Sequence, residues 1–316
     1  MVSFIVLTRK ILGRRGVFLL RNAISSFTYH TGLYEYADST TRHMGISALM
    51  CTYNEEDWIE PSILSIKDLV DEYVIVDSSN DRTPDIVRSV IEEHGLNIKL
   101  IRVPPGDLIQ ARLIALRNSS YKWLMSMDAD MILYEKGIKI IRDLIEELNP
   151  RRHYLVYWKY LLLCGDLYHV CGENPYHVEH WLFTYSSKLK YKYLDFGKGV
   201  YMEALIAPLT LYKPIYMDEV LGVHLTKVRS PVKLALKHLR LEYRKTLLEY
   251  IKAGLDAEKA LLKIAHDVYG TENLEEIGTR LIKGSVDRLP RYDESKYGPL
   301  PKVLLDYVKK KYSNFS

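Results

Sequence analysis

The stretch Trp123-Leu-Met-Ser-Met-Asp-Ala-Asp130 decides the fold, because an apolar run leads directly into two carboxylates one residue apart. An apolar run that contains few polar residues is typical of a buried parallel strand. Open α/β sheets bind ligands at the carboxyl ends of these strands. Two carboxylates this close repel each other unless a cation or a shared proton relieves the repulsion. We therefore expect Asp128 and Asp130 to lie at a crevice and to hold a hard divalent cation that bridges to a diphosphate.

The residues around this stretch alternate between strand and helix patterns. Apolar runs predict strands and periodic apolar positions predict helices. The predicted strands are 46–52, 73–76, 98–103 and 123–127, and the predicted helices are 57–70, 83–94, 107–118 and 135–148. Strands that alternate with helices form βαβ units. The expected fold class is therefore α/β, a Rossmann-like, mostly parallel sheet flanked by helices.

The pattern changes after residue 151. Residues 153–163 form an aromatic-rich strand pattern, and 168–171 could pair with its end across Gly165-Asp166. Shorter strands are expected at 181–185, 191–193 and 215–217, and helices at 232–253, 256–269, 274–282 and 304–312. The sequence thus predicts a basic amphipathic N-terminal segment (1–44), an α/β domain (45–228) and a helical C-terminal region (229–316).

Composition narrows the function. The chain has 316 residues, 47% of them hydrophobic, with a net charge of +4, which is an ordinary globular balance and does not indicate a nucleic-acid partner. No Gly-x-Gly-x-x-Gly and no P-loop is present, so dehydrogenase and P-loop functions lose their main support. A single glutamine (Gln110) beside 25 tyrosines resembles the composition of a thermophile's protein.

The three cysteines are Cys51, Cys164 and Cys171. So few cysteines indicate a reducing compartment, and we expect a cytoplasmic protein. A thermophilic source would still allow a Cys164–Cys171 bridge. The same region, with His169, His177 and His180, could alternatively hold zinc, although the spacing matches no common zinc site.

Four motifs in chain order resemble family 2 glycosyltransferases of the GT-A fold. They are Cys51-Thr-Tyr-Asn-Glu-Glu56, Val74-Ile-Val-Asp-Ser-Ser-Asn-Asp-Arg-Thr83, Ala111-Arg112 and Met127-Asp-Ala-Asp130. The resemblance is specific over about residues 46–133. The chain departs from the family pattern in the second motif, where one residue fewer separates Asp77 from Asp81.

The resemblance implies a metal-dependent, inverting transfer of a sugar from a nucleoside diphosphate sugar, with a nucleotide-sugar half at 45–133 and an acceptor half at 134–228. Glu55 would contact the ribose, Asp77 the base, and Arg112 the diphosphate or the acidic loop. The implied nucleotide-sugar-binding residues are Thr52, Tyr53, Glu55, Asp77, Arg112 and Asp128. The implied metal ligands include Asp128 and Asp130, which would hold Mg²⁺ or Mn²⁺.

The acceptor half must supply a general base. In related transferases a Glu precedes a strand similar to Gly222-Val-His224, which favours Glu203 as the base and His224 as a third metal ligand. Asp218 is the alternative base. A retaining transferase that makes a small glycoside and a non-catalytic nucleotide-sugar-binding scaffold stay open as alternatives.

The acceptor is expected to be lipid-linked or a glycan. Apolar clusters at 4–7 and 17–20 alternate with Arg9, Lys10, Arg14, Arg15 and Arg21, without a run long enough to span a membrane. This pattern predicts either peripheral contact with the inner face of an anionic membrane or a helix packed on the domain. A homodimer is a further expected association.

Overall fold

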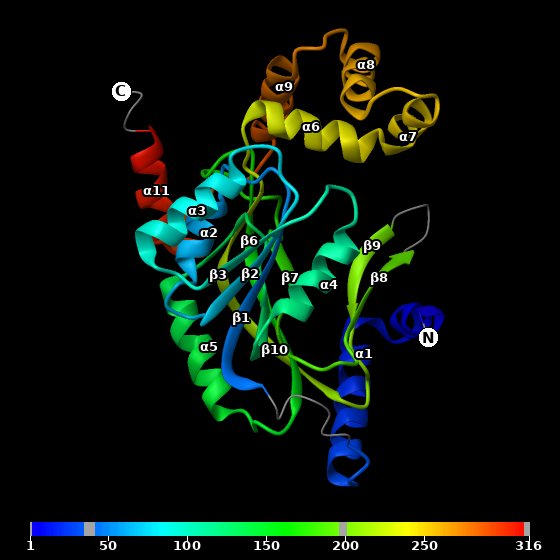
Figure 1. Ribbon diagram of the computed structural model, residues 1–316, viewed down its shortest axis with the longest axis vertical. Helices are drawn as coiled ribbons and strands as arrows, with labels where there is room; N and C mark the ends of the chain where they lie inside the picture. Colours follow the sequence, from blue (N-terminus) through cyan, green and yellow to red (C-terminus); the bar gives the residue numbers. More distant parts are fainter. Residues whose placement is uncertain (1, 35–41, 196–200, 313–316) are drawn as a thin grey trace. The chain divides into compact units, whose positions relative to one another are not determined.

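The computed structural model describes residues 2–34, 42–195 and 201–312. Its centre is an eight-stranded sheet in the order β3-β2-β1-β4-β7-β6-β10-β5, and β8 and β9 form a separate pair (Figure 1). The strands are β1 (His43–Thr52), β2 (Glu72–Asp77), β3 (Ile98–Arg102), β4 (Tyr121–Ser126), β5 (Met131–Leu133), β6 (His153–Cys164), β7 (Tyr176–Thr184), β8 (Lys190–Asp195), β9 (Tyr201–Ile206) and β10 (Tyr212–Lys227). The helices are α1 (Val2–His30), α2 (Ile59–Ser65), α3 (Thr83–His94), α4 (Leu108–Asn118), α5 (Glu135–Glu147), α6 (Pro231–Glu242), α7 (Arg244–Lys252), α8 (Ala257–Tyr269), α9 (Leu274–Val286), α10 (Glu294–Tyr297) and α11 (Lys302–Tyr312).

The predicted α/β fold is confirmed in the first half of the sheet. β1 pairs in parallel with β2 and with β4, and β2 pairs in parallel with β3. Because these four strands point the same way, their carboxyl ends share one edge. The sheet then changes direction, since β7 pairs with β4 in the antiparallel sense. The structure is therefore a mixed sheet whose parallel part forms the expected ligand-binding edge.

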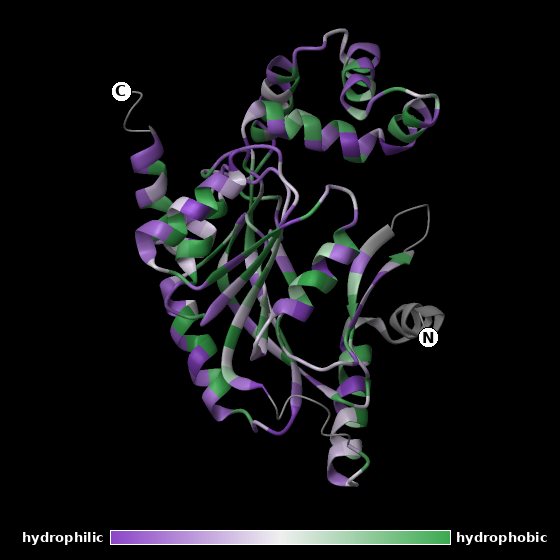
Figure 2. Cartoon of the chain, in the orientation of Figure 1, coloured by the Kyte–Doolittle hydropathy of each residue, from purple (hydrophilic) through white to green (hydrophobic). Residues whose placement is uncertain are grey.

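Helices cover both faces of this sheet. On one face Ile63 of α2, Val87 of α3 and Ile141 of α5 are completely buried in the larger core. On the other face Ala115 of α4 is completely buried in a second core, which also includes Tyr34 after α1. Figure 2 shows α5 with hydrophobic and hydrophilic residues interspersed along its length, as expected of a helix with one face on a core.

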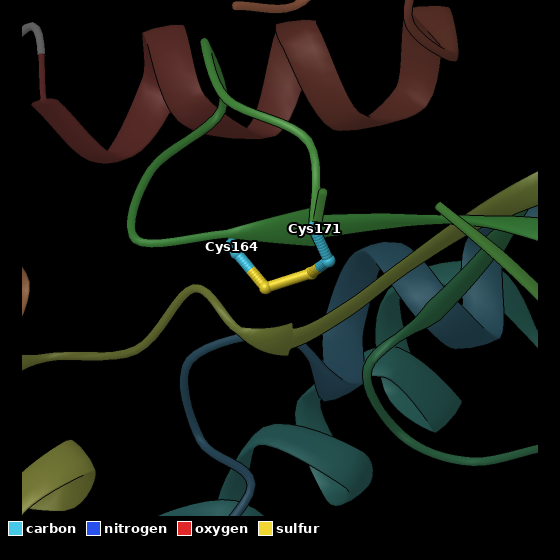
Figure 3. Close-up of a disulfide and its surroundings, with 2 residues drawn as sticks. All are labelled: Cys164 and Cys171. Carbon is cyan, nitrogen blue, oxygen red and sulfur yellow. A yellow bond between two sulfur atoms is a disulfide. The ribbon is translucent and has the colours of Figure 1, made fainter. Parts of the chain in front are cut away.

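The chain divides into two compact units. The first comprises 1–160, 178–222 and 301–316, and the second comprises 161–177 and 223–300. The second unit has its own small core, which includes Leu239 of α6, Ile264 of α8 and Ile277 of α9. It also contains the end of β6, where Cys164 and Cys171 form a disulfide (Figure 3).

Several predicted boundaries were wrong. The helix predicted over 57–70 is only α2, because Ile66 leaves helical geometry and the chain turns toward β2. The helix predicted over 232–253 is α6 and α7, separated at Tyr243. β5 and β9 were not predicted, and the short strands of the acceptor half extend further than expected as β7, β8 and β10. The hairpin at 163–170 is confirmed by a bridge between Leu163 and Val170.

The second half of α1 packs on the first unit. Arg21 donates a hydrogen bond to the Ala207 carbonyl oxygen (2.7 Å), and Thr28 donates one to the Thr210 carbonyl oxygen (2.5 Å). Gly13 interrupts the helix with φ 65°. The predicted membrane-facing residues 4–10 and Arg14 have side chains outside the described residues. Within the part of the chain that is described, no helix is both long and apolar enough to cross a bilayer.

Candidate active site

The carboxyl ends of the parallel strands form the floor of the candidate site. Thr52 of β1 lies opposite Asp77 of β2, and Asp77 lies opposite Arg102 of β3, so the three residues form one row across the sheet. β4 ends at Ser126, two residues before Asp128. The sheet therefore brings the first, second and fourth sequence motifs to a common edge, as the strand pattern predicts.

The loops that follow β1 and β2 are tied to each other by hydrogen bonds. Asn54 has a positive φ of 58°, which asparagine tolerates better than most residues. Its backbone N–H donates to Ser79 Oγ (2.7 Å), and its side-chain oxygen accepts from the Asn80 N–H (2.9 Å). The Glu55 N–H donates to Thr83 Oγ1 (2.8 Å). These bonds fix the position of the predicted ribose ligand, Glu55.

Asp77 lies beneath this rim. Its side chain has no exposed surface, and its Oδ1 accepts hydrogen bonds from the Thr52 and Ser79 hydroxyls, both at 2.6 Å. Its Oδ2 accepts from Arg102 Nη1 at 2.5 Å. Thr52 is also buried, whereas Tyr53 is exposed at the rim. Of the residues predicted to contact the nucleoside, Asp77 and Thr52 thus bind each other in this structure.

The two acids after β4 lie in a tight turn between β4 and β5. The Met131 N–H donates to the Asp128 carbonyl oxygen (3.1 Å), and Ser62 Oγ donates to the same oxygen (3.1 Å). Met127 and Ala129 are buried on either side of Asp128. The apolar residues therefore anchor the turn, while the Asp128 side chain keeps 36% of its surface exposed.

The strand β10 passes beside this turn. The Tyr134 N–H donates to the Leu221 carbonyl oxygen (2.8 Å), and Gly222 lies against the Ile132 carbonyl. His224 lies two residues beyond Gly222 on the same strand. Asp128, Asp130 and His224 each offer one ligand atom, and these atoms lie within 4.8 Å of one another. Two carboxylates and an imidazole form a donor set that suits a divalent metal ion.

A second histidine lies beside this group. His177 of β7 stacks on His224 with 5.5 Å between the ring centroids, and their Nδ1 atoms are 3.4 Å apart. A hydrogen bond between these two nitrogens would fix the orientation of the His224 ring. Hydrogen bonds to the second ring nitrogen are the usual way in which a metal-binding histidine is oriented. The sequence did not single out His177 for this role.

Arg112 of α4 connects the acidic turn with Glu203. Its Nη2 lies 3.2 Å from Asp128 Oδ1 and 2.8 Å from Glu203 Oε1. Burial alone lowers the pKa of Arg112, but Asp128, Cys51 and Glu203 together raise it well above its ordinary value, so the guanidinium stays charged. Arg112 therefore holds two carboxylates together that would otherwise repel each other.

Glu203 lies on β9, opposite Tyr193 of β8. Its Oε1 accepts both bonds from Arg112, while its Oε2 is buried with no hydrogen-bond partner among the described residues. Burial also raises the pKa of the neighbouring Cys51 thiol to about 11, so Cys51 is uncharged at neutral pH. The alternative base, Asp218 of β10, instead pairs with Lys159, and its side chain is 85% exposed.

The alternative zinc group is not formed. Cys164 and Cys171 are bonded to each other, so neither thiolate is available to a metal ion. His169 Nδ1 lies 2.8 Å from Asp166 Oδ1, and His180 Nδ1 lies 2.5 Å from Glu179 Oε1. The zinc alternative was therefore wrong, and the bridge permitted by the cysteine count is present.

Sequence reasoning missed Arg102, which the strand pattern treated only as the polar end of an apolar run. Its partner in β2 became visible only through the register of β2 and β3. The sequence does contain a signal that could have identified Arg102. This basic residue lies near the end of a predicted strand, whereas the neighbouring strands end in hydroxyl and acidic residues.

Open α/β sheets bind ligands, nucleotides among them, at the carboxyl edge of their strands, which is where these acids and the buried arginine lie. Residues 47–152 match the family model described as Glycosyl transferase family 2. This segment is about a third of the chain. It contains Arg112, Asp128 and Asp130 and ends before Glu203 and His224.

Solved glycosyltransferase structures are also similar to the chain. Residues 1–349 of TarS from S. aureus align at 16% identity over 71% of this chain and 72% of that one, with a TM-score of 0.41. The same TarS segment in complex with UDP-GlcNAc aligns at 18% identity over 71% and 73%, with a TM-score of 0.38. The mannosyltransferase PcManGT from Pyrobaculum calidifontis, in complex with GDP-Man and Mn²⁺, aligns at 14% identity over 94% and 92%, with a TM-score of 0.41. No curated protein sequence matches.

Proposed function

We propose that the protein is a metal-dependent, inverting glycosyltransferase that moves a sugar from a nucleoside diphosphate sugar to an acceptor. The observation that carries this proposal is the group Asp128, Asp130 and His224, whose ligand atoms lie within 4.8 Å of one another at the carboxyl edge of the sheet. The family match, which contains both aspartates, supports the same reaction class.

Asp128, Asp130 and His224 would hold Mg²⁺ or Mn²⁺. When bound, the ion neutralises the diphosphate that leaves the sugar. Hard cations of this kind prefer carboxylate oxygens, and Mn²⁺ also accepts an imidazole. Arg112 adds a fixed positive charge at the same carboxylate, because its Nη2 is 3.2 Å from Asp128. Arg112 would thus keep the acidic turn ordered and face the diphosphate.

Glu203 would act as the general base. Inversion needs a base that accepts the proton of the acceptor hydroxyl while that oxygen attacks the anomeric carbon from the side opposite the leaving group. Arg112 holds one oxygen of Glu203, and the unpartnered Oε2 is the atom that would accept the proton. Asp218 remains the alternative, although its exposure and its pairing with Lys159 favour it less.

The nucleoside would bind on the rim of β1 and β2, with Glu55 at the ribose and Tyr53 exposed beside it. The division into a nucleotide-sugar half (45–133) and an acceptor half (134–228), within a domain flanked by 1–44 and 229–316, belongs to the same proposal. The acceptor would be lipid-linked or a glycan. Peripheral membrane contact, a cytoplasmic location and a homodimer are further proposals that rest on the sequence.

Two alternatives have distinct outcomes. A retaining transferase would give a product with the donor's anomeric configuration, which nuclear magnetic resonance of the product distinguishes from inversion. A non-catalytic scaffold would bind a nucleotide sugar with Mn²⁺ but would release no nucleoside diphosphate in the presence of acceptors.

The test of the proposed function is the variant Asp130→Asn. Replacing a carboxylate ligand by an amide should weaken Mn²⁺ binding at least about 100-fold, as measured by isothermal titration calorimetry, and should abolish sugar transfer. The matched control is Asp143→Asn, which removes an exposed carboxylate of α5 that pairs with Lys139. Unchanged Mn²⁺ affinity in Asp130→Asn, with both variants folded, would remove the metal site from the proposal.

A further inference from the structure

The row of strand ends determines where the base of a bound nucleotide lies, an inference that rests on the proposed function. Adjacent strands are about 4.8 Å apart, so the end of β3 is about 14 Å from the end of β4, across β1 and β2. On this side of β4, the strands β1, β2 and β3 run parallel and end at the same edge, whereas β7 on its other side runs antiparallel to it. A nucleoside diphosphate with its phosphates at Asp128 therefore extends over β1 and presents its base to the ends of β2 and β3.

The acid at the end of β2 is not accessible to this base. Asp77 has no exposed side-chain surface, and its carboxylate accepts hydrogen bonds from the Thr52 hydroxyl, the Ser79 hydroxyl and Arg102. An N–H group of a base needs an acceptor that it can reach. A base recognised through a donor N–H, as the N3–H of uracil would require, finds no such acceptor in Asp77.

Arg102 offers the opposite chemistry at the same place. Its side chain is 44% exposed, its Nη1 donates to Asp77 (2.5 Å), and its Nη2 donates to the Ser79 carbonyl oxygen (2.6 Å). These two bonds fix the plane of the guanidinium and use two of its five N–H groups. The remaining donors form a rigid fork that recognises two neighbouring acceptors.

We propose that Arg102 selects guanine, so that the sugar donor is a GDP-sugar. Guanine presents O6 and N7 as adjacent acceptors, and arginine binds this pair with two hydrogen bonds. Adenine places an N6 amino donor beside N7, and uracil places the N3–H donor beside O4, so each turns a donor toward the guanidinium. The charge of the buried Asp77 thus holds Arg102 in place and does not itself contact the base.

The first test uses the unaltered full-length protein with Mn²⁺ and titrates GDP, UDP, ADP and CDP by calorimetry. GDP should bind about 10- to 100-fold more tightly than ADP and UDP, the discrimination that one bidentate arginine contact gives, and no more weakly than CDP. Inosine diphosphate keeps O6 and N7 and should bind like GDP, whereas 7-deaza-GDP lacks N7 and should bind about tenfold more weakly. Tighter binding of UDP, ADP or CDP, or equal binding of 7-deaza-GDP and GDP, would overturn the proposal.

The second test is Arg102→Lys, which keeps a positive charge beside Asp77 but removes the planar fork. The preference for GDP over UDP should fall to below threefold, while UDP affinity stays nearly constant. The matched control is Arg88→Lys, because Arg88 of α3 makes a similar bond to Asp85 (2.6 Å) on the helix surface. Circular dichroism checks that each variant folds.

The outcomes separate the two proposals. If Arg102→Lys folds and keeps the full preference for GDP, the role of Arg102 is disproved and the glycosyltransferase proposal stands. If no nucleoside diphosphate binds the unaltered protein with Mn²⁺, both proposals fail together. If Arg102→Lys does not fold, the comparison of GDP with 7-deaza-GDP on the unaltered protein decides.

Discussion

At the scale of single residues, the candidate site depends on charges that hold each other in place. Two arginines, Arg102 and Arg112, each bind a carboxylate at a strand end, but with different consequences. Arg102 pairs with a fully buried aspartate and remains half-exposed itself. Arg112 is nearly buried and pairs with two partly exposed acids. The first arginine can meet a ligand directly, whereas the second orders the acids that meet one.

This difference allows a sharp prediction for Glu203. Glu203→Gln keeps an oxygen that can accept from Arg112 but removes the proton-accepting carboxylate, so the turnover number should fall by about 10²- to 10⁴-fold. Nucleotide affinity should change little, because the fold of the acidic turn is retained. Steady-state kinetics and calorimetry measure the two quantities.

Asp218→Asn is the matched comparison, since it neutralises the rival acid in the same half of the domain. Its turnover number should stay within about threefold of the unaltered value. An active Glu203→Gln together with an inactive Asp218→Asn would transfer the role of the base to Asp218.

At the scale of elements, β10 has a glycine, Gly222, where it packs closely against β5 and the ring of Tyr160. A Cβ on Gly222 would meet the Ile132 carbonyl oxygen, and it would lie 2.6 Å from Cε1 of Tyr160. Both neighbours are buried, and the Ile132 carbonyl is backbone, so it cannot move without distorting β5. Gly222 thus allows β10 to approach the acidic turn closely enough for His224 to contribute.

Gly222→Ala should therefore lower the free energy of unfolding by about 1–3 kcal/mol, the usual cost of overpacking a core, as measured by urea denaturation. It should also weaken Mn²⁺ binding, because His224 lies two residues further along the strand. Gly284→Ala in α9 is the control: no atom lies within 4 Å of its Cβ position, and alanine favours helix. A Gly222→Ala variant as stable as the control would contradict the packing argument.

Much of this arrangement could be predicted from the sequence. The apolar runs before Asp77 and Asp128 identified buried strands, and parallel strands must end at one edge. The hydrophobic pattern of one strand does not determine its register with its neighbours, however. The pairing of Asp77 with Arg102 and of His224 with His177 therefore could not be predicted. β5 has three residues, which is too short for a periodic signal, and β9 lacks the alternation that marks a half-buried strand.

At the scale of the whole molecule, the open question is how the protein reaches its acceptor. The second half of α1 is fixed to the first unit by Arg21, Ser25 and Thr28. Leu19, Phe27 and Leu33 on and after this helix are more than 60% exposed. Exposed apolar side chains favour contact with an anionic surface, in addition to the alternating apolar clusters and basic residues of 4–21 from which the sequence predicts peripheral membrane binding.

Removal of residues 1–12 tests this prediction, because the deletion ends before Gly13 and leaves the contacts of Arg21 and Ser25 intact. The full-length protein should co-sediment with vesicles that contain phosphatidylserine, and less so at high salt, since each basic residue near the surface contributes about 1 kcal/mol. The shortened protein should stay in the supernatant while its Mn²⁺-dependent nucleotide binding is unchanged. The double variant Arg9→Glu with Lys10→Glu, which keeps the apolar residues, should lose binding to these vesicles as well. Equal recovery of full-length and shortened protein in the supernatant at low salt would show that residues 1–12 do not bring the site to a membrane, and would favour a water-soluble acceptor over a lipid-linked one.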